Sequence, residues 1–283
     1  MESLRWHQRP VLRRPVMVVA FGGWNDAADA ATGAVEYLVR TWSARVFADI
    51  DPEDFFDFTV SRPQIRLEEG LTRRVEWPTT TLAAASVPGT RRDVVLLQGT
   101  EPGLRWRHFT QAVVGVAADL GVEMVVGLGA LLADVPHTRP VKVTGTALDG
   151  GLVARLGLQQ SRYEGPTGIL GVLHDALRTA HIPSVSLWAN VPHYVAQSPS
   201  PKATLALVER TAGLLGTRVD VVDLQVATSA YERQINELVA ADDDAAAYVA
   251  RLEEAGDLED SPQASGDALA DEASRFLREH HGE

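Results

Sequence analysis

Two Val-Pro-His tripeptides, at residues 135–137 and 191–193, are the first groups in this 283-residue chain whose types suggest chemistry. Asp134 precedes one of them, and two histidines with a carboxylate are the smallest ligand set for zinc or iron. The separation of His137 from His193 is not that of a metal motif, and histidines in proline turns commonly bond backbone carbonyls. We therefore predict neither a metal site nor a cofactor.

A carboxylate in a proline-fixed loop is a second feature with chemical potential. Glu101 lies in the segment Gln-Gly-Thr-Glu-Pro-Gly at residues 98–103, directly after an apolar run. Its side chain could act as a general base or bind a hydroxyl group. The more ordinary interpretation is a carboxylate that caps a helix expected over residues 104–120. The sequence favours the capping role and leaves the catalytic one open.

The glycine-rich turn at residues 163–168 precedes another expected helix, at residues 169–180. Thr167 is a natural N-cap, and Glu164 precedes it by three positions. No carboxylate follows in the first helical turn, since the next one is Asp175. We therefore expect this helix N-terminus to be open to an anion or a polar ligand group.

The turn at residues 22–26, Gly-Gly-Trp-Asn-Asp, resembles a phosphate cradle only in part. It joins an apolar run at residues 16–21 to a helical pattern, but it is neither G-x-G-x-x-G nor a P-loop with its lysine. Asp26 and Asp29 place two carboxylates where a phosphate would bind. We predict that they cap the helix.

Strands and helices alternate along most of the chain, which predicts an α/β fold with a mostly parallel sheet covered on both faces. The strands are expected at residues 16–21, 45–50, 64–67, 72–76, 93–98, 122–129, 141–147 and 184–189, the third and fourth forming a hairpin. The helices are expected after residue 26 and at residues 104–120, 169–180, 200–215, 223–240 and 243–255.

Several of the polar residues follow expected strands, and the carboxyl ends of parallel strands meet at one edge of a sheet. Ligands of open α/β proteins bind at that edge. We therefore predict a pocket there, which the 163–168 turn joins if a strand also precedes it. Its candidate residues are Asn25, Asp26, Glu101, His137, Glu164, Thr167 and His193.

The C-terminal part differs from the rest in composition. Between residues 242 and 283 there are 13 acidic residues and three arginines, a net charge of −10 out of −12 for the chain. We predict an α/β domain over residues 1–222 and a helical C-terminal region over 223–283. Within that region, residues 256–268 are polar and predict a mobile linker before a last helix at 269–280.

Composition excludes several classes of protein. The absence of cysteine excludes disulfides and thiolate chemistry. No cluster of Lys and Arg indicates nucleic-acid binding, and no apolar stretch is long enough to indicate a membrane span. Arginines interrupt the N-terminal segment where a secretory signal would be apolar. We expect a cytoplasmic protein without nucleic-acid or membrane partners.

The combination of these motifs resembles the PAC2 family, the relatives of proteasome assembly chaperone 2. The matching segments are residues 21–27, 98–102, 127–130, 135–140, 165–169 and 186–194, and the C-terminal helices resemble those of the actinobacterial branch. The resemblance implies a three-layer α/β/α sandwich similar to nucleoside phosphorylases and hydrolases. It also implies a homo-oligomer, with a trimer as one form.

The function that the resemblance implies is that of a chaperone-like or scaffolding protein with a proteasome-related partner, rather than an enzyme. The chaperones of the family dock through a C-terminal hydrophobic-Tyr-X tail, and residues 279–283 of this chain, Glu-His-His-Gly-Glu, do not match it. We therefore expect any docking to differ in mode. The alternative is a small-molecule binder or a phosphorylase-like or hydrolase-like enzyme that uses the carboxyl-edge pocket.

Overall fold

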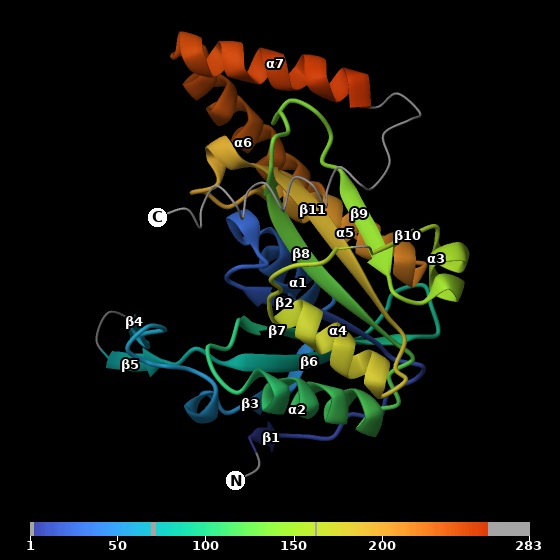
Figure 1. Ribbon diagram of the computed structural model, residues 1–283. Coiled ribbons are helices and arrows are strands. Elements are labelled where there is room, and N and C mark those ends of the chain that lie inside the picture. Colours follow the sequence, from blue (N-terminus) through green and yellow to red (C-terminus); the bar gives the residue numbers. More distant parts are fainter. Residues whose placement is uncertain (1–2, 69–71, 162, 260–283) are drawn as a thin grey trace.

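A nine-stranded mixed sheet forms the centre of the computed structural model, which describes residues 3–68, 72–161 and 163–259 (Figure 1). Its strands lie in the order β1-β3-β6-β7-β2-β8-β11-β9-β10. Their bounds are β1 Leu4–Trp6, β2 Val16–Gly22, β3 Arg45–Ile50, β6 Thr80–Ser86, β7 Asp93–Thr100, β8 Met124–Ala133, β9 Val143–Ala147, β10 Gln159–Gln160 and β11 Ser184–Pro192.

The four central strands β7, β2, β8 and β11 run parallel to one another, as the alternating pattern predicts. They are runs of valine, leucine and alanine buried on both faces, which is typical of the parallel part of an α/β sheet. The flanking strands β6 and β9 are antiparallel to their central neighbours β7 and β11. The parallel arrangement therefore holds at the centre, where the connections are helical.

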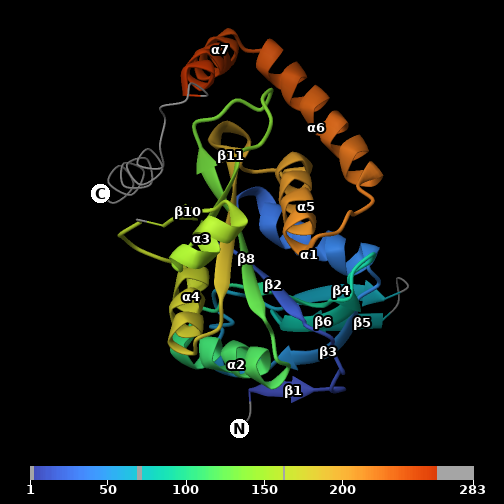
Figure 2. The same cartoon turned by 90° about the vertical axis from the view of Figure 1, so that its right-hand side faces the viewer.

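Helices cover both faces of the sheet and complete the expected α/β sandwich (Figure 2). Helices α1 (Ala30–Thr41) and α5 (Pro201–Leu215) pack on one face, with the 3-10 turn Ala27–Asp29 leading into α1. Helices α2 (Trp106–Asp119) and α4 (Ile169–Thr179) pack on the other. The sheet thus separates two apolar cores, each built from alternate residues of the same strands.

Four elements differ from the sequence-based expectation. Strands β1, β6 and β10 and the short helix α3 (Gly150–Leu156) are not predicted. Strand β6 has the sequence Thr-Thr-Leu-Ala-Ala-Ala-Ser, and alanine has little intrinsic preference for strands. Its conformation is set by pairing with β3 on one side and β7 on the other, a tertiary effect that the local sequence does not contain.

The hairpin and the C-terminal helices lie outside the main sheet. Strands β4 (Gln64–Glu68) and β5 (Thr72–Glu76) form a separate two-stranded hairpin, as predicted. Helix α6 (Val222–Ala240) packs on α5 and then contacts α7 (Asp243–Glu259) (Figure 2). The linker predicted from residue 256 is wrong at its start, because α7 continues to Glu259. Its remainder and the helix predicted at 269–280 lie outside the described residues.

Candidate functional site

The loops that follow the central parallel strands meet at their carboxyl edge, as expected. The backbone N–H of Glu101, after β7, donates a hydrogen bond to the carbonyl of Gly22 at the end of β2, at 2.8 Å. The N–H of Ala130 in β8 donates to the carbonyl of Asn25, at 2.9 Å. These bonds bring the β2, β7 and β8 segments together and place several of the predicted site residues near one another.

Glu101 caps a helix, but not the helix that the sequence suggests. Its Oε1 accepts a 2.7 Å hydrogen bond from the backbone N–H of Ile169, the first residue of α4. The same oxygen accepts a 3.2 Å bond from Nδ2 of Asn25, which is almost fully buried. The carboxylate thus fills the positive end of α4 from a different loop. The expectation that this helix end is open to an anion is wrong.

Gly168 makes this contact possible. A Cβ at this position would lie 2.2 Å from Asn25 Nδ2 and 2.7 Å from Glu101 Oε1, both far inside van der Waals contact. Gly168, not the predicted Thr167, is the N-cap residue of α4, and its own conformation is extended. Thr167 and Glu164 are exposed in the preceding loop. The close approach explains why glycine precedes α4, a constraint that local capping rules do not reveal.

Asp26 caps α1, which confirms its predicted role. Its Oδ1 accepts a 2.6 Å hydrogen bond from the N–H of Ala31, and its other oxygen accepts from the hydroxyl of Thr32. Burial raises the pKa of the Asp26 carboxyl, and these hydrogen bonds oppose the shift. Asp29 has a left-handed backbone and makes no side-chain capping bond, so the predicted capping role of Asp29 is wrong.

His137 holds the C-terminal helices rather than facing a cavity. Its side chain is 3% exposed, with Nε2 2.9 Å from Oδ1 of Asn236 in α6 and Nδ1 2.8 Å from the hydroxyl of Tyr194. The Tyr194 hydroxyl also accepts the backbone N–H of His137, so its own proton is free to donate to Nδ1. The neutral ring with its proton on Nε2 satisfies every partner.

His193 lies at the more exposed side of the same junction. Its Nδ1 is 2.9 Å from a carboxylate oxygen of Asp134, the acidic neighbour that the sequence suggests. That oxygen also accepts a 2.9 Å hydrogen bond from the hydroxyl of Tyr248 in α7. Burial, followed by the bond to Asp134, raises the pKa of Tyr248 to about 12. Both Val-Pro-His loops therefore fasten the C-terminal helices to the sheet.

Lys202 adds a further link between the His137 loop and helix α6. Its ammonium donates a 2.6 Å hydrogen bond to the carbonyl of His137 and forms a 2.6 Å ion pair with Glu232 of α6. The sequence gives no signal for Glu232, Asn236 or Tyr248 as partners, because they are ordinary helix residues. Tyr194 differs from these residues, because it directly follows the second Val-Pro-His. That motif could have indicated its contact with His137.

Five of the seven predicted site residues therefore form two structural groups, and Glu164 and Thr167 belong to neither. Asp26 and Glu101 bind the starts of α1 and α4, and Asn25 bonds to Glu101. His137 bonds to α6, and His193 bonds to Asp134, which bonds to Tyr248 of α7. Over residues 3–68, 72–161 and 163–259, no three acidic, histidine or cysteine side chains are arranged to hold a metal ion. The shared carboxyl-edge pocket remains a prediction, and the side-chain chemistry found at this edge is that of helix capping and helix attachment.

Comparison with known proteins places the fold and these motifs in one family. The model of the PAC2 family matches residues 20–239. The chain belongs to the PAC2 family. A PAC2 family protein from Streptomyces avermitilis is 49% identical, with a TM-score of 0.78 over 83% of this chain and 99% of that one. The Mycobacterium tuberculosis proteasome-assembly chaperone homologue Rv2125 is 48% identical, with a TM-score of 0.75 and the same coverage of both chains.

More distantly related structures share the fold. Pyrococcus furiosus PbaB, an archaeal proteasome activator, has a TM-score of 0.68 at 16% identity and covers 84% of this chain and 99% of its own. None of the curated proteins searched matches the chain. Among the described residues, no helix is long and apolar enough to cross a membrane.

Proposed function

We propose that this PAC2 protein is a chaperone-like protein of the cytoplasm that assists proteasome assembly. The observation that carries the proposal is its 48% identity with the M. tuberculosis proteasome-assembly chaperone homologue, over 99% of that chain. Identity at this level over a full length favours the same type of macromolecular partner.

The chemistry of the carboxyl edge supports a binding protein over an enzyme. Oε1 of Glu101, the general-base candidate of the sequence, and the ring of His137 bond to other protein groups. A general base must be within hydrogen-bond reach of a substrate proton. Both ring nitrogens of His137 are engaged in this way, and Oε1 of Glu101 is committed to the start of α4.

The β4–β5 hairpin supplies a surface suited to a protein partner. Ile65 pairs with Val75 across the hairpin, and Leu67 follows on the same face because strand side chains alternate. These three side chains are 65%, 47% and 62% exposed, respectively. A contiguous exposed apolar face on a protruding element is typical of a protein-binding site. We assign it to contact with a proteasome subunit or with another copy in a homo-oligomer, such as a trimer.

The test uses the full chain with separately purified proteasome α- and β-subunits of the same organism. We expect the chain to co-elute with α-subunits in gel filtration and to accelerate half-proteasome formation on native gels. Leu67→Asp should abolish both effects, whereas Gln64→Asp, on the opposite face of the hairpin, should preserve them. The absence of co-elution and of any change in assembly rate at micromolar concentration would refute the proposal.

Light scattering after gel filtration tests the homo-oligomer separately. A molar mass of two or more times 30.6 kDa supports self-association, and three times that mass supports a trimer. A monomer at micromolar concentration would remove the second copy as a partner of the hairpin and leave the proteasome subunit.

A further inference from the structure

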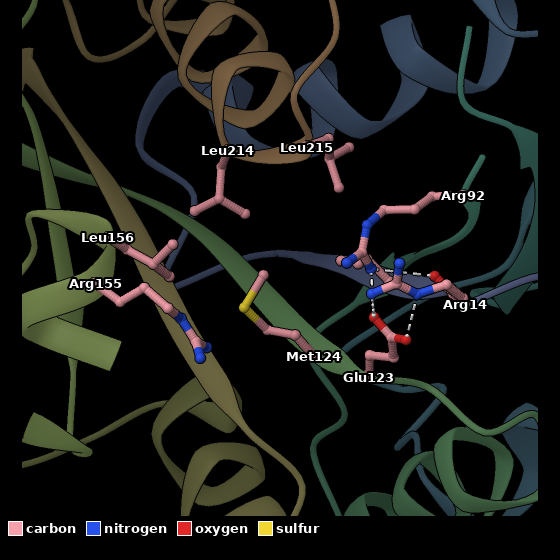
Figure 3. Close-up of a pocket in the computed structure, with 9 residues that line it drawn as sticks. Arg14, Arg92, Glu123, Met124, Arg155, Leu156, Leu214 and Leu215 are labelled. Atoms are coloured by element: carbon pink, nitrogen blue, oxygen red, sulfur yellow. Dashed lines mark hydrogen bonds and ion pairs between the residues drawn. The ribbon is translucent and has the colours of Figure 1, made fainter. Parts of the chain in front are cut away.

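A pocket of about 320 Å³ opens at the edge of the sheet opposite the loops described above (Figure 3). It lies where β2, β7 and β8 begin, beside the ends of α3 and α5. Its volume is at the lower end of the range for ligand pockets, about 300–1,000 Å³. The nine residues that line it are Arg14, Val16, Arg92, Glu123, Met124, Arg155, Leu156, Leu214 and Leu215.

The polar side of the pocket carries a positive charge. Arg14 Nε lies 2.9 Å from Glu123 Oε1, and Arg92 Nη1 bonds the other oxygen of the same carboxylate. These bonds to Arg14 and Arg92 lower the pKa of Glu123, so it is ionised at neutral pH. Both carboxylate oxygens are therefore engaged. Three arginines and one glutamate leave a net charge of +2 in a protein whose total charge is −12.

Arg155 is the arginine that remains available. It stands in the last turn of α3, across the pocket from the Arg14–Glu123–Arg92 group (Figure 3). Its side chain is exposed, and within the part of the chain that the structure describes its guanidinium has no hydrogen-bond or ion-pair partner in the protein. A guanidinium presents five donors in a planar fork that fits carboxylate and phosphate oxygens.

The remainder of the lining is apolar. Val16 and Leu215 are almost fully buried, and Met124, Leu156 and Leu214 are partly buried around them. Figure 3 shows Met124 between the Arg155 side and the Arg14 side, with Leu214 on the α5 wall. A wholly inorganic anion would leave these side chains without contacts. An uncharged apolar molecule would gain nothing from the exposed, positively charged guanidinium of Arg155.

We propose that this pocket binds a small amphipathic anion, with one carboxylate or phosphate group on Arg155 and a short hydrocarbon chain against Val16, Met124 and Leu214. The proposal goes beyond the chaperone-like function. It also concerns a different edge of the sheet, so the two can fail independently.

Isothermal titration with octanoate, octyl phosphate, octan-1-ol and inorganic phosphate tests the proposal on the full chain. We expect saturable 1:1 binding of octanoate or octyl phosphate, and the tighter of the two identifies the head group. Octan-1-ol and inorganic phosphate should each bind at least about tenfold more weakly. Octan-1-ol lacks the charged head group, and inorganic phosphate lacks the hydrocarbon chain. Equal binding of octan-1-ol, or no saturable binding of either amphiphile at millimolar concentration, would overturn the proposal.

Two variants locate the site. Arg155→Leu should weaken binding of the tighter amphiphile about tenfold, whereas Arg107→Leu, which removes an exposed arginine from α2 on the opposite face, should not change it. Leu214→Phe should fill the pocket and abolish binding, with a melting curve to show that the variant is folded. Equal losses in the Arg155 and Arg107 variants would indicate nonspecific attraction and refute the assignment.

Discussion

The two edges of the same parallel strands differ in what the polar side chains described above bind. At the carboxyl edge, Asn25, Asp26, Glu101 and His137 bond to helix ends and helix side chains. At the amino edge, Arg155 beside the pocket has no partner among the described residues, and the buried ring of His174 has a free nitrogen. Ligands of α/β proteins usually bind at the carboxyl edge. In this chain the predicted site residues at that edge fasten helices, and the pocket with an exposed, available arginine lies at the other edge.

Among the titratable groups at the two edges, we expect His174 to give the largest effect of acid on stability. This ring is fully buried, its Nδ1 is 2.9 Å from the hydroxyl of Ser184 at the start of β11, and burial lowers its pKa to about 4. Below pH 6.5 the unfolded chain takes up a proton that the folded chain refuses until about pH 4. Stability should therefore fall by about 3 kcal/mol over this interval.

The measurement is urea unfolding of the wild type and of His174→Leu between pH 7.5 and 4.5. The variant removes the titrating group, so its stability should decline less steeply than that of the wild type. Parallel pH profiles would show that the carboxyl edge or other groups control acid sensitivity, and the contrast between the edges would lose this support.

The crowded carboxyl edge should not tolerate an added methyl group at Gly168. We expect Gly168→Ala to cost about 2 kcal/mol, because the new Cβ would collide with Asn25 and Glu101, which are held by their own hydrogen bonds. The matched control is Gly103→Ala, where a Cβ meets no atom within 4 Å. Equal free energies of unfolding in urea would show that the capping contact can relax, contrary to our account.

Attachment of the C-terminal helices should depend more on His137 than on His193. His137→Leu leaves Oδ1 of the Asn236 side chain without its ring partner, and we expect a loss of about 1–2 kcal/mol in protection of α6. His193→Leu removes an exposed polar contact with Asp134, a kind of contact that contributes about 0–1 kcal/mol. Hydrogen exchange of the amides in residues 222–240 measures both. Equal protection in the two variants would contradict the proposed anchor.

Much of the fold could be predicted because the central strands are unbroken apolar runs followed by amphipathic helices. The contacts of the site residues were harder to predict, because their bonding partners are distant in the sequence. Glu101 and Ile169 are 68 positions apart, so nothing near Glu101 indicates which helix it caps. The partner of His137 lies 99 positions away in a helix with no motif. Residue types indicated buried polar contacts, but pairing between distant segments decides which ones form.

The bond between His137 and Asn236 has a consequence for synthesis of the chain. His137 is translated with the central sheet, but its ring partner follows 99 residues later. At about 5–20 residues per second, this interval lasts on the order of 5–20 seconds. During that time the end of β8 exists without the helix that will cover it. The nascent protein must therefore remain soluble while this end of the sheet is uncovered, until α6 has been synthesised and Asn236 can bond to His137.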